Sequence, residues 1–372
     1  MTRFCAKTIF VVAFGLTLVG ILTLTYVGKV ESASEPFHYM IMQSLFAVLG
    51  LVAMTVCYRV DYHFFLRKEV LWTLGVGMVV ALLLVLTPGV GKTIAGSRRW
   101  IGLGPVNVQP SEFVKLGVIL FLSGYLGRIG ALAQRWKFGI VFPCVLIGVL
   151  LVLILAQPDF GSTMIVAGLS VLMLLVGGVG LKRLAVPGAL AAVAIAALLV
   201  TNENRLQRLI NDHEGENYQA KQSELAFQNG GLLGVGLGRG MQKEHYLPEC
   251  HTDFIYAVIA EDLGLAATGS IWVAYVAMLL CGTVIALRAP DKQGMALAFG
   301  ATTLLCGQAA ANIAVVTHVF PTKGLALPFL SYGGSCLLAS YCAVGVLLGV
   351  GRTAAEAQDA PLPPGGRPIS LS

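Results

Sequence analysis

The strongest constraint in the sequence is a series of long apolar stretches separated by short polar segments. An apolar stretch of about 20 residues is long enough to cross the roughly 30 Å hydrocarbon core of a bilayer as a helix. Only 12% of the 372 residues are charged, whereas soluble domains carry about a quarter. A chain with so few charges cannot cover a water-facing surface of this size. The sequence therefore predicts a membrane protein.

Ten stretches qualify, or nearly qualify, as spans. They are residues 8–28, 39–58, 70–87, 113–127, 138–156, 162–181, 184–201, 265–287, 295–319 and 335–351. We predict an all-α polytopic fold of about ten transmembrane helices, with residues 1–352 forming one integral membrane domain. Residues 353–372, which include a Pro-Leu-Pro-Pro-Gly-Gly run, are predicted to be a disordered cytoplasmic tail.

Lysine and arginine set the expected orientation. With the N-terminus in the cytoplasm, the predicted inner segments hold fourteen of these residues and the short outer loops hold five. Both termini are then cytoplasmic, and the long polar loop at about 202–252, between helices 7 and 8, is extracytoplasmic. The net charge of +6 is a topology signal and does not indicate nucleic-acid binding. Arg98 and Arg99 fall on the outer face, an exception to the charge rule that suggests a function.

Two motif-like strings carry little weight. Residues 89–93 imitate the end of a phosphate-binding loop, but the first glycine of that motif is missing. The glycine-dense stretch 230–240 predicts a flexible turn that lets the backbone approach something bulky.

His245, Glu249 and His251 lack the spacing of a zinc site.

A first polar cluster lies at the predicted outer face. It contains Arg98, Arg99 and Trp100, followed by Gln109, Ser111, Glu112 and Lys115. Pro110 marks a helix start, which is a natural anion site, and two arginines offer bidentate donors for phosphate. The cluster could be a cradle for phosphate or pyrophosphate. The structural alternative is an arginine pair that reaches lipid headgroups beside an intrahelical Glu112–Lys115 pair.

A second cluster, Gln157 and Asp159, lies between two apolar stretches. Asp159 either caps the helix that follows or orients a basic residue of the first cluster.

The third cluster surrounds Asp253, where the polar loop re-enters the membrane, and includes His251 and Thr252. Partial desolvation raises the pKa of a carboxyl group, which suits a general base. The alternative is again a helix cap.

At these residues the sequence resembles a known family. Ser97-Arg-Arg-Trp-Ile, Gln109-Pro-Ser-Glu, Gln157-Pro-Asp-Phe-Gly, Leu247-Pro-Glu-Cys-His-Thr-Asp-Phe-Ile and Pro328-Phe-Leu-Ser-Tyr-Gly-Gly-Ser335 are similar to motifs of the SEDS (shape, elongation, division, sporulation) family. The resemblance runs from the third span to the tenth. Residues 321–324 and 231–238, with Gln242 and Lys243, look more like the division member than the rod-elongation member. Cys250 departs from the family, which more often has a small residue there.

The resemblance implies a peptidoglycan glycosyltransferase that polymerises lipid II into β-1,4 glycan strands at the outer face of the cytoplasmic membrane, with an undecaprenyl-diphosphate leaving group. It assigns the family's essential aspartate to Asp253, as the base for the acceptor 4-hydroxyl. Arg98, Arg99 and Lys115 would hold the pyrophosphates. Glu112 and Asp159 would orient those cations or share a divalent ion, Mg or Mn, with the pyrophosphate; no organic cofactor is expected. The remaining predicted substrate-binding residues are Trp100, Gln109, Ser111, Gln157, His251, Thr252, Lys243, Lys323 and Ser331.

The expected partners are the lipid II substrate, a class B penicillin-binding protein transpeptidase and other division proteins, with no nucleic acid. The expected location is the bacterial cytoplasmic membrane at the division septum. Three alternatives remain at this stage: a lipid II flippase, suggested by the intramembrane polar residues Gln308, Asn312 and His318, the rod-elongation paralogue with the same chemistry, and a scaffold that only recruits division proteins.

Overall fold

The protein is a helical membrane protein in the computed structural model. The structure describes residues 1–31, 35–94, 97–104, 106–189, 213–320 and 324–359. Seven helices in these ranges are long and apolar enough to cross a membrane. They are α1 (Thr2–Glu31), α2 (His38–Arg59), α4 (Lys68–Leu86), α6 (Phe142–Ala156) with the turn Lys137–Val141 before it, α11 (Ile255–Leu287), α12 (Lys292–Val316) and α13 (Gly334–Asp359).

The other helices are shorter or less apolar. They are α3 (Tyr62–Phe65), α5 (Pro110–Ile129), α7 (Phe160–Val176) and α10 (His213–Gly230), with helical turns at Gly130–Gln134 and Gln242–Tyr246. These elements confirm the predicted class of fold, whereas the count of ten spans stays a prediction. The predicted seventh span, 184–201, is helical through residue 189, and the rest of it lies outside the described residues.

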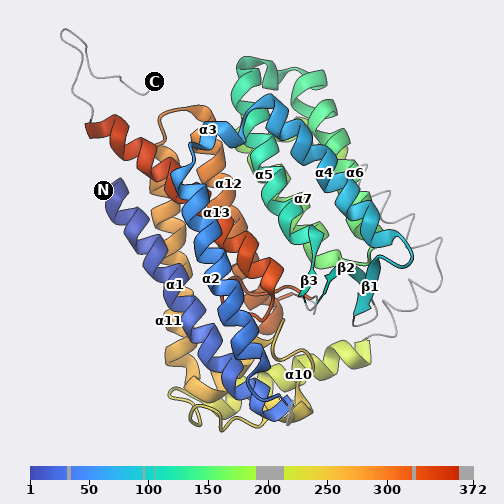
Figure 1. Cartoon of the computed structure of the whole chain (residues 1–372), viewed down its shortest axis with the longest axis vertical. Helices are drawn as coiled ribbons and strands as arrows, with labels where there is room; N and C mark the ends of the chain where they lie inside the picture. The colour runs from blue at the N-terminus through green and yellow to red at the C-terminus, as the bar shows by residue number, and fades with distance from the viewer. Residues whose placement is uncertain (32–34, 95–96, 105, 190–212, 321–323, 360–372) are drawn as a thin grey trace.

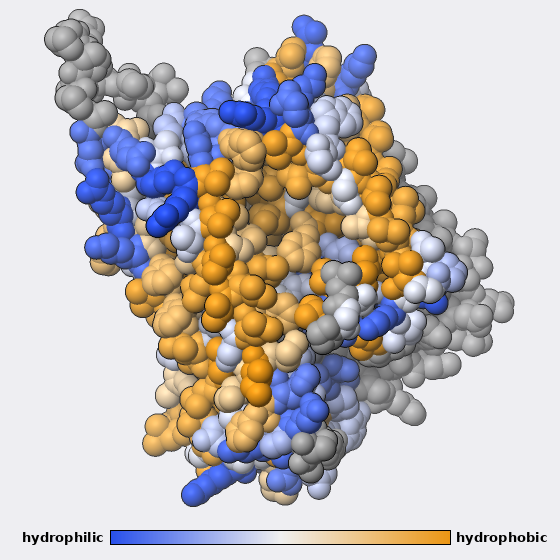
Figure 2. All heavy atoms as spheres, in the orientation of Figure 1, coloured by the Kyte–Doolittle hydropathy of each residue, from blue (hydrophilic) through white to orange (hydrophobic). Residues whose placement is uncertain are grey.

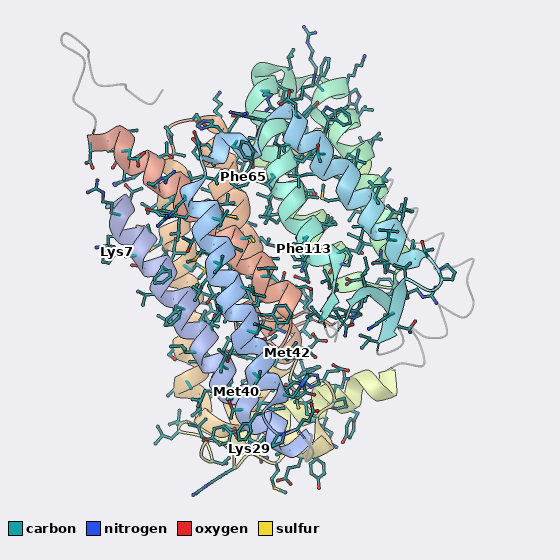
Figure 3. All side chains as sticks on the ribbon, in the orientation of Figure 1. Lys7, Lys29, Met40, Met42, Phe65 and Phe113 are labelled. Atoms are coloured by element: carbon teal, nitrogen blue, oxygen red, sulfur yellow. The ribbon has the colours of Figure 1, made fainter. Side chains whose placement is uncertain are left out.

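The helices form two groups (Figure 1). One contains α1, α2, α11, α12 and α13, and the other contains α4, α5, α6 and α7, with α12 packed against both α5 and α7. The first turn of α1 and the last turn of α13 lie at the same end of the molecule, where Arg3 pairs with Asp359. Lys7 lies toward that end and Lys29 toward the opposite one (Figure 3). Figure 2 shows a broad apolar band with polar residues gathered above and below it, which is the surface of a membrane-embedded bundle.

Helix α13 is the most buried of the spans, with 83% of its apolar window inside the molecule. Two glycines allow it to lie close to α2. A Cβ atom at Gly345 would come within 2.5 Å of the Met54 carbonyl oxygen, and one at Gly50 within 2.5 Å of the Tyr341 ring. Small residues at such positions are how membrane helices gain contact area, because lipid supplies no hydrophobic force between them.

A small antiparallel sheet, absent from the all-α prediction, joins α4 to α5. Its strands are β1 (Gly91–Ile94), β2 (Ser97–Leu103) and β3 (Val106–Val108), in the order β1-β2-β3. The register pairs Lys92 with Trp100 but Thr93 with Arg98, so Arg99 is the extra residue of a β-bulge.

Helix α11 is interrupted near its start. Gly264 has φ 79° and ψ −179°, which separates a short buried helix, Ile255–Leu263, from the membrane-spanning part. The glycine-dense stretch packs on this break, where the Val235 and Gly236 N–H groups donate to the carbonyl oxygens of Glu261 and Asp262. The predicted close approach of this stretch is therefore observed, and the bulky neighbour is the broken helix.

The predicted start of the disordered tail at residue 353 is corrected by the structure. Helix α13 continues to Asp359, with Ala354 and Ala355 buried. Thr2 donates to Gln358, and Arg3 forms an ion pair with Asp359, so the first turn of α1 holds this extension. The rest of the predicted tail lies outside the described residues.

Candidate active site

Asp253 lies in a tight turn just before the short helix of α11. The carbonyl oxygen of Glu249 accepts from the N–H groups of Thr252, Asp253 and Phe254, and Glu249 itself has a left-handed φ of 55°. Asn312 on α12 donates from Nδ2 to the Asp253 carbonyl oxygen at 2.8 Å. A non-glycine residue keeps a strained backbone conformation of this kind only where the surrounding contacts hold it. Here those contacts hold the turn and so fix the position of the Asp253 carboxyl group.

The Asp253 carboxyl lines a cavity of about 400 Å³. The cavity lies where α2, α5, α7 and α13 begin. Nine of the predicted site residues line it: Arg99, Trp100, Gln109, Glu112, Lys115, Asp159, His251, Thr252 and Asp253. Segments far apart in the sequence thus converge on one site, as predicted.

The pKa of Asp253 is raised to about 7. Burial in the cavity wall is the largest cause, and the nearby Glu249 carboxylate also raises it, while the Arg99 guanidinium lowers it. A carboxyl with a pKa near the ambient pH can accept a proton efficiently and release it again.

Arg99 and Trp100 both face the cavity although they are neighbours on β2. Successive side chains of a regular strand point to opposite faces, and the bulge at Arg99 removes that alternation. Arg99 Nε and Trp100 Nε1 are buried and have no hydrogen-bond acceptor among the described residues. Two N–H donors without acceptors beside a cavity form a site for an anion or another acceptor. Arg98, on the same strand, is not among the lining residues.

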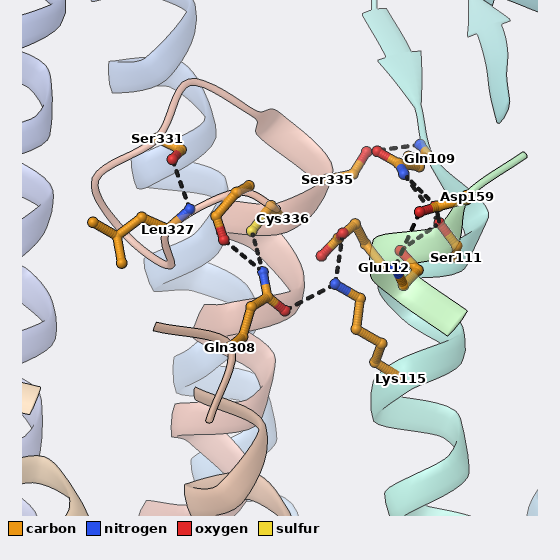
Figure 4. A network of polar contacts seen from close by, with 12 residues as sticks. Gln109, Ser111, Glu112, Lys115, Asp159, Gln308, Leu327, Ser331, Ser335 and Cys336 are labelled. Carbon is orange, nitrogen blue, oxygen red and sulfur yellow. Dashed lines mark hydrogen bonds and ion pairs between the residues drawn. The ribbon is translucent and has the colours of Figure 1, made fainter. Parts of the chain in front are cut away.

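Lys115 forms the floor of the cavity with two partners (Figure 4). Its Nζ lies 2.7 Å from Glu112 Oε1 and 2.8 Å from Gln308 Oε1. The Gln308 amide in turn donates to the Ala326 carbonyl oxygen at 2.8 Å, which ties α5 to α12 and to the loop before α13. The predicted intrahelical Glu112–Lys115 pair is therefore present, and it also belongs to the cavity wall.

Asp159 caps α7 and lines the cavity as well. One carboxylate oxygen accepts from Ser162 N at 3.0 Å, and the other accepts from Ser111 Oγ at 2.9 Å and Gln109 Nε2 at 3.1 Å (Figure 4). The predicted role as a helix cap is therefore observed, and the residues of the first cluster that Asp159 orients, Gln109 and Ser111, are polar but not basic.

Four predicted residues have structural contacts away from the cavity lining. Gln157 donates to the Leu82 carbonyl oxygen, and Ser331 donates to the Thr252 carbonyl oxygen at 2.6 Å. Ser111 contacts Asp159, as described above. Lys243 is fully buried against Asp262, at 2.6 and 2.9 Å from its two oxygens. Lys323 lies outside the described residues.

The residues present do not suit a metal ion held by the protein alone. Among the described residues no group of three His, Cys, Asp or Glu side chains is placed to hold one. Glu112 is paired with Lys115, and both oxygens of Asp159 accept hydrogen bonds.

Sequence reasoning did not place three polar residues at the site, although it noted two of them, Gln308 and Asn312, as polar residues within a span. Gln308 and Asn312, four residues apart on one face of α12, anchor the two loops around Asp253, and Ser335 accepts from the Gln109 backbone N–H. Polar side chains inside an apolar span are costly unless they have partners. That cost, together with the spacing of four, was the available signal.

Comparison with known proteins agrees with this geometry. The model of the cell cycle protein family of FtsW, RodA and SpoVE matches residues 3–356. The chain belongs to this family. Because FtsW and RodA are its division and rod-elongation members, the predicted SEDS resemblance is confirmed.

Among the family's curated proteins, one from Legionella pneumophila named probable peptidoglycan glycosyltransferase FtsW is 37% identical, covering 90% of this chain and 88% of its own. Proteins of the same name from Geobacter metallireducens and Marinobacter nauticus are 37% and 41% identical, covering 92% and 91% of this chain and 93% and 88% of their own.

Two solved structures of the family have the same fold. One, described as the structural coordination of polymerization and crosslinking by a peptidoglycan synthase complex, has a TM-score of 0.73 at 26% identity and covers 92% of this chain and 98% of that chain. The rod shape determining protein RodA of Thermus thermophilus has a TM-score of 0.68 at 25% identity, covering 93% and 96%.

Proposed function

We propose that the protein is a peptidoglycan glycosyltransferase that polymerises lipid II at the outer face of the cytoplasmic membrane during division. The observation that carries the proposal is the cavity itself. Its wall contains the Asp253 carboxyl, which has a pKa of about 7, and the buried N–H donors of Arg99 and Trp100, which have no acceptor among the described residues. The relatives named as peptidoglycan glycosyltransferases support the same activity.

The chemistry follows from those groups. Asp253 accepts the proton of the acceptor 4-hydroxyl as its oxygen attacks the anomeric carbon of the donor sugar. The bond from that carbon to the pyrophosphate breaks, and its electron pair leaves with the undecaprenyl pyrophosphate. Attack opposite the leaving group inverts the carbon and yields a β-linkage. The proton on Asp253 then passes to solvent.

The leaving group needs donors for its growing negative charge. Arg99 Nε and Trp100 Nε1 are suited to this because they are already oriented and desolvated, so little reorganisation is needed when charge develops. Lys115 contributes less net charge because Glu112 neutralises it. We assign the clamp to Arg99 and Trp100, with Lys115 and Glu112 as its supporting floor.

No step is assigned to a protein-held metal, since Glu112 and Asp159, the two residues predicted as possible ligands, already have partners. If a divalent ion, Mg or Mn, accompanied the pyrophosphate, Glu112 or Asp159 would help to hold it, and it would offset the negative charge of the leaving group.

The division septum is the proposed location, supported by the relatives named FtsW. A class B penicillin-binding protein is the proposed partner, supported by the similar chain in a peptidoglycan synthase complex that couples polymerisation to crosslinking. Gln308 and Asn312, which suggested a transporter, here anchor the loops around Asp253.

The test is polymerisation of purified lipid II in detergent, where flipping between compartments plays no part. We expect Asp253→Asn to lose at least about 100-fold in rate, the range for removing a general base, with an unchanged unfolding temperature. Asp61→Asn is the matched control, because Asp61 caps α3 at the opposite end and an amide can still accept that hydrogen bond. Full activity of Asp253→Asn would refute the assignment.

A further inference from the structure

Three aromatic rings from distant segments meet at one wall of the cavity. The Tyr39 ring on α2 stacks on His251 at a centroid distance of 4.9 Å and tilts against Tyr332 at 4.7 Å. Tyr332 N donates to the His251 carbonyl oxygen at 2.9 Å, which fixes two of the rings relative to each other. All three rings line the cavity, and each is half-buried. We call Tyr39, His251 and Tyr332 the ring cluster.

The ring cluster and the anion donors come from different parts of the fold. The cluster belongs to α2, the turn before α11 and the loop before α13, whereas Arg99 and Trp100 belong to the sheet that joins α4 to α5. Figure 1 shows these segments apart, with the first turns of α2 near the bottom of the view and the sheet to the right of the lower end of α13. Asp253, two residues from His251, lines the same cavity as both.

The geometry of displacement at the anomeric carbon implies different roles for the ring cluster and for the pair Arg99 and Trp100. The attacking hydroxyl must approach opposite the bond that breaks. If the pyrophosphate lies at Arg99 and Trp100, the sugar that carries the hydroxyl must lie across the anomeric carbon from those donors, and the ring cluster is a part of the cavity wall built from other elements. A pyranose ring presents C–H groups on its faces and hydroxyls at its edges, so it packs well on an aromatic surface with polar tips. The neighbouring carboxylate of Glu249 and hydroxyl of Thr252 can accept from those edges.

We propose that the ring cluster is the acceptor subsite, which binds the saccharide that supplies the 4-hydroxyl. The inference rests on the proposed function and divides that site into a donor side and an acceptor side. The ligand is the acceptor disaccharide, whether it stands at the end of a strand or on a lipid II molecule.

The experiment separates the two substrates chemically. Lipid II blocked at its 4-hydroxyl serves as donor only, and a disaccharide-peptide without pyrophosphate serves as acceptor only. Formation of the single linkage is followed while one is varied and the other is kept in excess. We expect Tyr332→Leu and Tyr39→Leu each to raise the apparent KM for the acceptor about tenfold, with the donor KM within about twofold. Tyr332→Phe and Tyr39→Phe should retain most of the affinity, since they keep the rings.

Tyr58→Leu is the matched control, because Tyr58 contacts Arg352 at the other end of the bundle, and it should change neither KM. Unfolding temperatures identify any variant that fails to fold, and the Leu variant of the other tyrosine then decides the matter. An increase in the donor KM instead, or no change in either, overturns the acceptor assignment. Absence of any product with the unmodified protein would overturn the proposed function itself, which is a different outcome.

Discussion

Asp253 has a cation and an anion as neighbours, and they act on its pKa in opposite directions. Arg99 lowers that pKa and Glu249 raises it. Since the base must be ionised to accept a proton, activity should rise with pH through the pKa of Asp253, near 7. Arg99→Ala removes the cation that favours the carboxylate, so the rising limb should move to higher pH. Glu249→Gln removes a like charge, so the limb should move to lower pH.

The measurement is the pH profile of kcat/KM for lipid II polymerisation in the unmodified protein and both variants. Gln at 249 can still accept the hydrogen bond that Thr252 Oγ1 donates to Glu249, so the turn should persist. Shifts of the same sign in the two variants, or none, would show that another group titrates. Arg99→Lys keeps a positive charge and should keep the limb closer to its original position.

At the scale of elements, a buried ion pair joins the outer loop to the short helix of α11. Lys243 and Asp262 are each about 1% exposed, and Asp262 also accepts from the Gly238 and Gly240 N–H groups. Lys243→Met leaves that carboxylate buried without its cation, which costs about 3–5 kcal/mol of unfolding free energy. Thermal unfolding in detergent should show the loss, with exposed Lys292→Met as control. A raised KM for lipid II with unchanged stability would restore the predicted substrate-binding role of Lys243.

The break in α11 depends on glycine. Gly264 has φ 79°, and a Cβ there would lie 2.4 Å from Gly234 N. Gly264→Ala should therefore lower the unfolding temperature, because it combines left-handed strain with a backbone clash. Gly269→Ala, on the same helix with open space around it, should be neutral or stabilising by up to about 1 kcal/mol. Equal effects of the two substitutions would contradict this account.

These elements also show which features could be predicted from the sequence and which could not. Apolar length predicts spans because the bilayer imposes it, and motif spacing brought Asp253, Arg99 and Lys115 together correctly. The sheet was missed because strands of three to seven residues leave no periodic signal beside a helical span. Lys243 was assigned to substrate because charge alone does not reveal a buried partner nineteen residues away.

At the scale of the whole molecule, the first and last described helices hold each other. Truncation after Arg352 removes buried Ala354 and Ala355 and the residues that contact Thr2 and Arg3. We expect a loss of about 1–2 kcal/mol in unfolding free energy, mainly from the apolar surface of the two alanines. Truncation after Asp359 removes only the remaining part of the predicted disordered tail and is the control. A larger loss in the control would contradict the tail prediction.

Burial across the bundle explains a further limit of prediction. The hydropathy of α13 resembles that of the lipid-facing spans, yet α13 is largely enclosed by protein. In a bilayer both environments are apolar, so composition separates spans from loops more easily than it separates inner helices from outer ones. The contacts of Gly50 with α13 and of Gly345 with α2 mark the difference at the level of atoms.

The short helix Ile255–Leu263 connects two places that are chemically unrelated. Its first turn follows Asp253, and its last turn carries Glu261 and Asp262, which hold the outer loop through Gln242 N and Lys243 Nζ. At 1.5 Å per residue the segment is roughly 13 Å long, so a single short helix separates these two places. Loss of the contacts that residues 238–243 make with Glu261 and Asp262 is therefore expected to disturb the turn that carries Asp253 as well as the loop itself.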